Sequence, residues 1–294
     1  MMKVGIIGTG MLGYAICTRL LKYKFKLIVY NRTRSKALNL KNQGAIIAKT
    51  PEEIASNSEI ILTIVKDSSA IHEIAFGKNG IIDGKYEDLT IADISTINPI
   101  DSIKLEKKFS KYNIVMLDTP VMGGPKAAIN GELILMASGK KIIYEKYKKI
   151  FKCIAKQTFY LGKYGTSHLI KLSMNMQIAF LAISISEGIM LAKRASIDPQ
   201  LFLKILNSTY FKTGMSENKA YKMIDNNFKP TFMLKNLRKD LDIATSVAYS
   251  LGLNLPITRK INTIYKNAEQ KGFGELDYTG IFAYLNKISN KSNK

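Results

Sequence analysis

The feature that most constrains this chain is a glycine-rich turn after its first apolar run. The run KVGII leads into GTGMLG at residues 8–13, and a helical pattern, YAICTRLLK, follows directly. Glycines at these spacings allow a tight turn, a close approach of the backbone to a ligand, and close packing of the helix on the strand. Because a helix N-terminus also presents amide donors, the pattern is typical of a dinucleotide site rather than of a purely structural turn. We assign to this site Gly8, Gly10, Met11, Leu12 and Gly13.

The first half of the chain, from Lys3 to about Gly162, alternates short β-rich runs with helical patterns. The runs are KVGIIG, LIVYN, AIIA, EIILTIV, LTIADIS, NIVMLDTPV, LILMAS and TFYL. Strands that are apolar on both faces are typical of a parallel sheet covered by helices. We therefore expect an α/β, Rossmann-type domain with a mainly parallel sheet and helices on both faces. Thr50-Pro51-Glu52-Glu53 is a capping box with proline at the first helical position, and it predicts a helix start.

The second half of the chain shows no strand rhythm. After Gly165, apolar residues recur at spacings of three and four, which is the period of a helix buried on one face. Asp198-Pro199 predicts a helix start, and Gly252 and Gly272 predict helix ends. We expect this half to be all helical.

These patterns predict two domains, a Rossmann domain at residues 1–164 and a helical domain at residues 165–294, joined by a long helix. The apolar run IAFLAISISEGIMLA, residues 178–192, is too short for a membrane span and carries Glu187. We interpret it as a helix buried between domains or subunits, and we expect a homodimer or homotetramer built on it.

The composition narrows the possible partners. The net charge of +21, from 44 Lys and Arg against 23 Asp and Glu, would suit nucleic acid. The lysines are spread along the chain, however, and no aromatic-basic recognition motif appears, so we expect the charge to attract small anions instead. Cys17, Cys153, His72 and His168 lack the spacing of metal ligands, and the first residues lack an export signal. We expect a reduced cytoplasmic protein without a metal site, a membrane partner or a nucleic-acid partner.

The end of the second β-rich run indicates which dinucleotide is bound. KLIVY is followed by Asn31-Arg32-Thr33, where a site for NAD commonly carries an acidic residue that holds the ribose hydroxyls. Asparagine does not repel a 2′-phosphate, and Arg32 and Thr33 can donate hydrogen bonds to one. We predict that the domain at residues 1–164 binds NADP(H) in preference to NAD(H). The alternative is that Arg32 only faces solvent.

Three further motifs narrow the range of protein families that the sequence can belong to. They are DTPVMGGPKAAINGEL at residues 118–133, GTSHLIKLSMN at residues 165–175, and FMLKNLRKDLDIA at residues 232–244. Together with the glycine-rich turn, and in this order, they resemble the β-hydroxyacid dehydrogenase family. That family includes 3-hydroxyisobutyrate dehydrogenases, tartronate semialdehyde reductases and glyoxylate/succinic semialdehyde reductases. The likeness extends nearly from end to end of the chain.

The resemblance implies a substrate bound between the two domains, with its carboxylate on the glycine-rich segment and a lysine as general acid and base. That lysine matches Lys171, and Asn175 matches an asparagine of the same motif. The residues that the resemblance places at the substrate are Thr96, Met122, Gly123, Gly124, Phe232 and Asp240. Those placed at the cofactor, beside the glycine-rich turn, are Asn31, Arg32, Thr33, Val65, Thr96 and Lys239.

Elementary chemistry supports this role for Lys171. Asn175 lies one helical turn further along, so both side chains project from the same face of the helix. When a hydride reaches a carbonyl carbon, negative charge grows on the oxygen, and an ammonium group can stabilise that charge and donate the proton. The alternative is a lysine that only extends to solvent, as most lysines do.

Three positions depart from the family pattern. Met122 stands where many members have a serine that helps to hold the carboxylate, Met174 replaces an asparagine, and Ser167 replaces a glycine. These changes leave the identity of the substrate open. Neutral packing changes are the alternative interpretation.

We therefore expect an NADPH-dependent reductase of a small carboxylate-bearing aldehyde, such as glyoxylate or succinic semialdehyde. One alternative is a 3-hydroxyisobutyrate-type dehydrogenase that oxidises a β-hydroxy acid, although Asn31-Arg32 argues against its usual preference for NAD. Another is an imine reductase, but these typically lack the lysine. An alternative of a different class is a non-enzymatic relative associated with nucleic acid, which would also lack the lysine.

Overall fold

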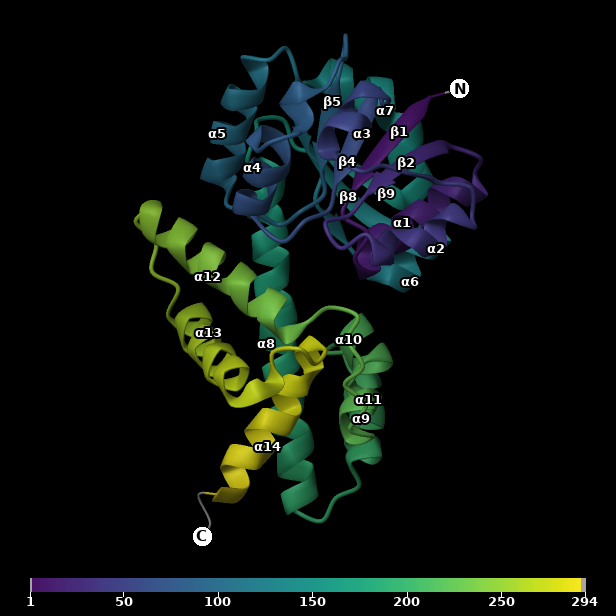
Figure 1. Ribbon diagram of the computed structural model, residues 1–294. Helices are drawn as coiled ribbons and strands as arrows, with labels where there is room; N and C mark the ends of the chain where they lie inside the picture. The colour runs from purple at the N-terminus through teal and green to yellow at the C-terminus, as the bar shows by residue number, and fades with distance from the viewer. Residues whose placement is uncertain (1, 292–294) are drawn as a thin grey trace. The chain divides into compact units, whose positions relative to one another are not determined.

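The computed structural model describes residues 2–291 of the 294-residue chain (Figure 1). The chain divides into two compact units, Met1–Lys171 and Leu172–Lys294. The long helix α8, Thr166–Arg194, belongs to both, because the boundary falls within it.

The N-terminal unit is built on a nine-stranded sheet with the order β3-β2-β1-β4-β5-β6-β8-β7, in which β9 pairs with β8. Every pair from β3 to β6 is parallel, and the order 3-2-1-4-5-6 is that of a dinucleotide-binding fold. The predicted Rossmann-type, mainly parallel sheet is therefore confirmed. The strands are β1 Lys3–Ile7, β2 Lys26–Tyr30, β3 Ile46–Ile47, β4 Ile60–Thr63, β5 Thr90–Asp93, β6 Val115–Asp118, β7 Val121–Met122, β8 Leu133–Gly139 and β9 Ala155–Tyr160.

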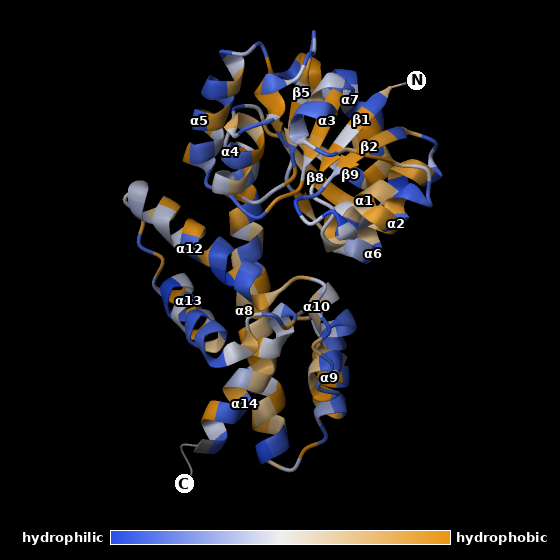
Figure 2. Ribbon diagram, viewed as in Figure 1, coloured by the Kyte–Doolittle hydropathy of each residue, from blue (hydrophilic) through white to orange (hydrophobic). Residues whose placement is uncertain are grey.

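Helices cover both faces of this sheet, as predicted. Because successive side chains of a strand point to opposite faces, Val4 and Ile6 of β1 pack with α1 and α7, whereas Ile7 packs with α3, α4 and α5. Figure 2 shows the resulting apolar strands between helices with polar outer faces. The helices are α1 Met11–Lys22, α2 Ser35–Lys41, α3 Pro51–Ser56, α4 Ser68–Phe76, η1 Ile81–Asp83, α5 Pro99–Ser110, α6 Pro125–Asn130 and α7 Lys141–Ile154.

The C-terminal unit is helical, which confirms the prediction for this half of the chain. Its apolar core gathers around the middle of α8, where Ala179, Ala182 and Ile189 are buried with Tyr265 and Phe282. The elements after α8 are α9 Pro199–Asn207, α10 Gly214–Asn218, α11 Ala220–Ile224, α12 Leu234–Ser250, α13 Pro256–Ala268, η2 Glu269–Phe273, η3 Tyr278–Gly280 and α14 Ile281–Lys291.

The predicted helix boundaries have identifiable causes. The Thr50 hydroxyl accepts a hydrogen bond from Glu53 N, as in a capping box, but the Glu53 carboxylate accepts from Lys49 N instead of from Thr50. Asp198 caps α9 by accepting from Gln200 N. Gly252, just after α12, has φ +69°, a left-handed conformation that favours glycine and ends the helix.

Two predicted segments differ in detail. The run NIVMLDTPV forms two strands, β6 and β7, because Pro120 lacks the N–H that a continuous ladder requires. Helix α8 is longer than its apolar run, at 29 residues, and its most apolar window has a mean hydropathy of 1.5. Length and composition alone would let α8 cross a membrane, a property that buried helices of soluble proteins share.

Candidate active site

The glycine-rich turn between β1 and α1 has the shape that a dinucleotide requires. Gly8 has φ +102°, and a Cβ there would lie 2.1 Å from the Ile64 carbonyl oxygen. A Cβ on Gly13 would lie 1.9 Å from the Gly8 carbonyl oxygen. A Cβ on Gly10 would meet no atom within 4 Å, so the fold itself leaves open space at this position. The chain thus needs glycine at Gly8 and Gly13 for its own packing, and Gly10 keeps room for a ligand beside the start of α1.

Asn31, at the end of β2, supports this turn. Its Oδ1 accepts a hydrogen bond from Thr9 N at 2.9 Å, and its Nδ2 donates to the Thr33 carbonyl oxygen at 2.9 Å. The Thr9 hydroxyl is buried and has no hydrogen-bond partner within the described residues. A buried hydroxyl without a partner beside an open glycine turn fits a site that a polar ligand completes.

Arg32 follows Asn31 and points away from the core. Its side chain is 83% exposed, and its guanidinium lies 3.7 Å from the Glu73 carboxylate of α4. Val65, after β4, is tied to the neighbouring strand end because its N–H donates to Ser95 Oγ at 3.0 Å. Thr96, the next residue after Ser95, is half-buried in the loop that leads into α5. The residues assigned to the cofactor in this unit therefore follow the carboxyl ends of β1, β2, β4 and β5.

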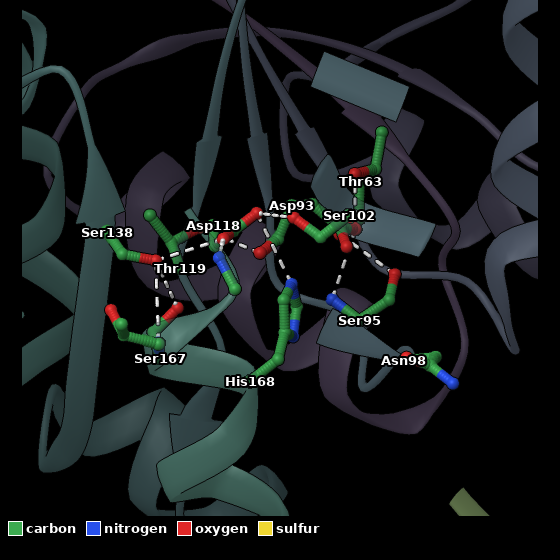
Figure 3. A network of polar contacts seen from close by, with 12 residues as sticks. Thr63, Asp93, Ser95, Asn98, Ser102, Asp118, Thr119, Ser138, Ser167 and His168 are labelled. Carbon is green, nitrogen blue, oxygen red and sulfur yellow. Dashed lines mark hydrogen bonds and ion pairs between the residues drawn. The ribbon is translucent and has the colours of Figure 1, made fainter. Parts of the chain in front are cut away.

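Two buried aspartates organise the ends of β5 and β6 (Figure 3). Asp93 accepts hydrogen bonds from the Thr63 hydroxyl at 2.7 Å and from Ser95 N at 3.2 Å. Burial raises the pKa of Asp93, against the opposing influence of His168 and of these hydrogen bonds. The carboxyl group of Asp93 thus holds together the two loops that carry Val65 and Thr96.

Asp118 connects β6 to the start of α8. Its carboxylate accepts from Gly165 N at 2.7 Å, from the Ser138 hydroxyl at 2.9 Å, and from the Ser102 hydroxyl. The His168 ring lies beside it. Burial alone would raise the pKa of Asp118, but the contact with His168 and the hydrogen bonds together hold it below its ordinary value. Asp118 therefore stays ionised at neutral pH and fixes where α8 begins.

Lys171 lies on the second turn of α8, next to the glycine-rich segment after β7. Its Nζ donates to Met122 Sδ at 3.2 Å, although the two residues are far apart in the sequence. Gly123 has φ +114°, and a Cβ there would lie 2.8 Å from Leu133 Cδ2. Gly124 faces open space. The structure thus brings together the lysine, the methionine and the two glycines that the sequence assigned to one site.

The helical unit brings together a second group of assigned residues. Asn175, one turn beyond Lys171 on α8, donates from Nδ2 to Asp240 Oδ2 at 2.6 Å. Lys239 Nζ lies 2.9 Å from Asp240 Oδ1. The Oδ1 atom of Asn175 is buried and has no hydrogen-bond partner in the described part of the chain. Asn175, Asp240 and the partly exposed Lys239 therefore form one polar group that joins α8 to α12.

Phe232 lies in the segment that precedes α12. Its ring centroid is 6.1 Å from that of Tyr278, and its N–H donates to the buried Asp277 carboxylate at 3.3 Å. Asp277 also pairs with Lys219 at 2.8 Å. The position of Phe232 is thus set by a carboxylate that sequence reasoning did not identify.

Asp93, Asp118 and His168 are buried residues beside the candidate site that the sequence analysis did not assign to it. The signal for the two aspartates was present, since each ends an apolar strand in LTIADIS and NIVMLDTPV. The His168 ring is buried, and neither of its nitrogens has a hydrogen bond of normal geometry within residues 2–291. Among these residues no group of three or more His, Cys, Asp or Glu could hold a metal ion.

Comparisons with known proteins agree with this arrangement. Residues 3–162 match the family model described as the NAD binding domain of 6-phosphogluconate dehydrogenase. Residues 165–285 match the model described as NAD-binding of NADP-dependent 3-hydroxyisobutyrate dehydrogenase. A solved structure called 3-hydroxyisobutyrate dehydrogenase, from Salmonella typhimurium, covers 97% of this chain and 100% of its own with a TM-score of 0.89 and 22% identity, and it shares the fold.

Two curated relatives extend along almost the whole chain. Glyoxylate/succinic semialdehyde reductase 1 of Arabidopsis thaliana is 30% identical over 280 residues, which are 95% of this chain and 97% of that protein. Cytokine-like nuclear factor N-PAC of Xenopus tropicalis is 29% identical over 284 residues, which are 96% of this chain and 53% of that protein. With both family models matched in order and a reductase aligned over nearly its full length, this chain belongs to the β-hydroxyacid dehydrogenase family of NAD(P)-binding oxidoreductases.

Proposed function

We propose that this protein is an NADPH-dependent reductase of a small carboxylate-bearing aldehyde, glyoxylate or succinic semialdehyde, with Lys171 as the general acid. The observation that carries the proposal is the distance of 3.2 Å between Lys171 Nζ and Met122 Sδ. Met122 leads directly into Gly123 and Gly124, so the only ammonium group assigned to proton transfer lies beside the segment assigned to the substrate carboxylate.

The chemistry at Lys171 follows from charge. A nicotinamide cofactor, when bound, would supply the hydride for the carbonyl carbon of the substrate. Negative charge then grows on the carbonyl oxygen, where the Lys171 ammonium stabilises it and donates the proton. A thioether sulfur is a weak hydrogen-bond acceptor. An aldehyde oxygen therefore competes well with Met122 for the ammonium, and a developing alkoxide competes better still.

Asn175 has a supporting role in this proposal. Its Nδ2 is bound to Asp240, whereas its Oδ1 has no partner among residues 2–291 and is an acceptor that an ammonium on the same helix face can use. We propose that the Asn175 carbonyl oxygen accepts a hydrogen bond from the Lys171 ammonium and so orients it for proton transfer.

The preference for NADPH rests on the end of β2. Both polar atoms of the Asn31 amide are used inside the protein, and β2 is followed by this amide where NAD sites commonly carry an acidic residue. Arg32 is exposed and its guanidinium is 3.7 Å from Glu73, a distance that leaves its donors able to turn to a 2′-phosphate. This charge pattern supports the proposed preference for NADPH. The ratio of kcat/KM with NADPH to kcat/KM with NADH measures that preference.

The test is NADPH oxidation with glyoxylate and with succinic semialdehyde by the parent, Lys171→Ala and Lys163→Ala. Lys163 is the matched control, because it is an exposed lysine just before α8. We expect Lys171→Ala to lower kcat by about 10²- to 10⁴-fold, the usual contribution of a general acid, and Lys163→Ala to leave it unchanged. NADPH binding, followed by its fluorescence, should be equal in all three. Activity of Lys171→Ala within about threefold of the parent would remove the lysine from the mechanism.

A second candidate function is oxidation of 3-hydroxyisobutyrate, which the match of residues 165–285 to the 3-hydroxyisobutyrate dehydrogenase model favours. The same protein preparation, assayed in the oxidative direction with NADP and NAD, separates the two reactions. The relation to a nuclear factor and the charge of +21 suggest one more assay, a DNA mobility shift at several salt concentrations. Salt-dependent DNA binding without reductase activity would favour the non-enzymatic alternative.

A further inference from the structure

His168 is a buried histidine that the proposed reaction does not use. It lies in the first turn of α8, three residues before Lys171, and its side chain is 0% exposed. Its Nε2 is 3.4 Å from Asp118 Oδ1. The ring nitrogen is thus in polar contact with the Asp118 carboxylate, at a distance longer than that of an ordinary hydrogen bond. Figure 3 shows the ring pointing from α8 toward the strand ends that carry Asp93 and Asp118.

The groups around His168 belong to the segments that carry the proposed site. Asp93 binds Ser95 N, and Thr96 is the next residue. Asp118 binds Gly165 N, the residue before α8 begins. The ring is therefore the part of α8 that faces both strand ends.

If the residue at position 168 only filled space, we would expect an apolar side chain there. Burying an ionisable ring beside two buried carboxyl groups costs desolvation energy, which an apolar side chain of similar volume would avoid. His168 opposes the rise that burial causes in the pKa of both Asp93 and Asp118, and for Asp118 it is the largest influence of this kind. The ring thus links the first turn of α8 to the ends of two strands, in addition to the bond between Asp118 and Gly165.

We propose that His168 is a positioning residue for Lys171: held against Asp118, its ring fixes the first turn of α8 and so sets where the next turn places the ammonium. This inference rests on the proposed function, in which Lys171 is the general acid. Three residues span about 4.5 Å along a helix, so a shift of the first turn is passed on to the lysine almost unchanged. A displacement of about 1 Å is enough to reduce a rate by about 10²-fold.

The kinetic test compares the parent with His168→Leu, His168→Gln and His72→Leu. Leucine fills the space without charge or N–H, and glutamine keeps an N–H donor. His72 is the matched control, because it is the other histidine of the chain and is exposed. We expect His168→Leu to lower kcat by about 10- to 100-fold per folded molecule, and His168→Gln to recover most of that loss. The Kd of NADPH should stay unchanged, because the glycine-rich turn is untouched.

A second measurement does not depend on catalysis. Reductive methylation with formaldehyde and cyanoborohydride, followed by mass spectrometry of the peptides, reports how freely each lysine amine reacts. In the parent, Lys171 is half-buried and bound to Met122, so it should react slowly. We expect His168→Leu to label Lys171 faster, with the exposed Lys163 unchanged as the internal reference.

The outcomes separate this inference from the proposed function. Faster labelling of Lys171 in His168→Leu, combined with full activity of Lys171→Ala, would support the positioning and refute the acid role. A kcat within about twofold of the parent, with labelling unchanged, would overturn the positioning. If His168→Leu did not fold, His168→Gln would decide, and a lower melting temperature without any change in kcat or labelling would again overturn it.

Discussion

The N-terminal unit and the helical unit both bury carboxylates, but they surround them with different groups. Asp93 and Asp118 lie at the ends of parallel strands and accept hydrogen bonds mainly from hydroxyls and backbone N–H groups. Asp240 and Asp277 lie among helices, and each forms an ion pair with a lysine. The helical unit therefore buries charge together with a countercharge that still reaches solvent.

The difference follows from backbone hydrogen bonding. At the end of a parallel sheet the strands stop and loops begin, so N–H groups and short polar side chains from several segments meet. A helix uses its own N–H groups internally, except in its first turn. A carboxylate between helices must therefore find side-chain partners, as Asp240 does in Asn175 and Lys239, or a loop, as Asp277 does in Thr231 and Phe232.

The comparison teaches which unit can hold a site rigidly. The strand-end carboxylates accept buried hydrogen bonds from the Thr63 hydroxyl at 2.7 Å, Ser95 N at 3.2 Å and Gly165 N at 2.7 Å, in or next to the segments that carry Val65, Thr96 and the start of α8. A lysine partner has a flexible side chain and remains partly hydrated, as Lys219 is at 21% exposure. We expect the loss of a strand-end carboxylate to cost more stability than the loss of one between helices.

The largest effect should come from Asp118→Asn. The amide of asparagine keeps one acceptor oxygen but loses the charge that faces His168. The three donors to Asp118, from Ser102, Ser138 and Gly165, then compete for that single oxygen. Breaking a buried network of this kind costs about 3 kcal/mol of the free energy of unfolding. Urea denaturation at neutral pH measures it. Asp88→Asn, an exposed aspartate in the same unit, is the matched control and should cost nothing measurable.

The pH dependence of this variant has a definite sign. The folded pKa of Asp118 is below its ordinary value, so the carboxylate stabilises the fold above the unfolded pKa of about 3.9. That stabilisation is lost as the pH falls through the folded pKa. The difference in the free energy of unfolding between the parent and Asp118→Asn should therefore have its full value above about pH 5 and become smaller at lower pH. A difference that stayed constant down to pH 3 would contradict the ionised state of Asp118.

An intermediate effect is expected from Asp277→Asn in the helical unit. Burial would raise the pKa of Asp277, but Lys219 and the hydrogen bonds from Thr231 hold it low, so the charge is stabilising at neutral pH. Because Lys219 can return to water, we expect a loss of about 1–2 kcal/mol, less than for Asp118→Asn. Hydrogen exchange of the segment around Phe232 should accelerate, since Phe232 N–H binds this carboxylate.

Lys219→Met sharpens the same comparison. It leaves Asp277 buried with the donors of Thr231, Phe232 and Thr279, and it removes the countercharge together with the Lys219 bond to Thr231 Oγ1 and its contact with the Tyr278 ring. If the ion pair matters more than the loop hydrogen bonds, Lys219→Met will cost as much as Asp277→Asn. A larger loss for Asp277→Asn than for Asp118→Asn would reverse the expected order of the two units.

The fold was predictable because its signals are local. Buried parallel strands read as short apolar runs, and GTGMLG has two glycines, Gly8 and Gly13, that the backbone itself requires. The break in NIVMLDTPV was also readable, because Pro120 cannot donate to a ladder. Helix starts at Thr50 and Asp198 followed from side chains that cap within three residues.

The site was less predictable because its partners are distant in the sequence. Lys171 and Asn175 were found through a motif, but nothing near them indicated that Asn175 would bind Asp240 or that Lys171 would bind Met122. His168 looked ordinary because burial depends on which strand ends the helix start meets. Pairings of this kind are fixed by tertiary packing, and a single sequence carries no local pattern for them.

The smallest effect should come from changing the exposed ion pair of the N-terminal unit. Its members are Arg32 and Glu73, whose side chains are 83% and 65% exposed. If Arg32 binds the 2′-phosphate, Glu73 competes for it, and Glu73→Gln should lower the KM for NADPH about twofold without changing the KM for NADH. The difference should fade as salt is added, since the charges are exposed. Glu87→Gln, another exposed glutamate of the same unit, is the control. Equal changes for NADPH and NADH would mean that Glu73 acts on the site without reference to the 2′-phosphate, and the argument for Arg32 would lose its support.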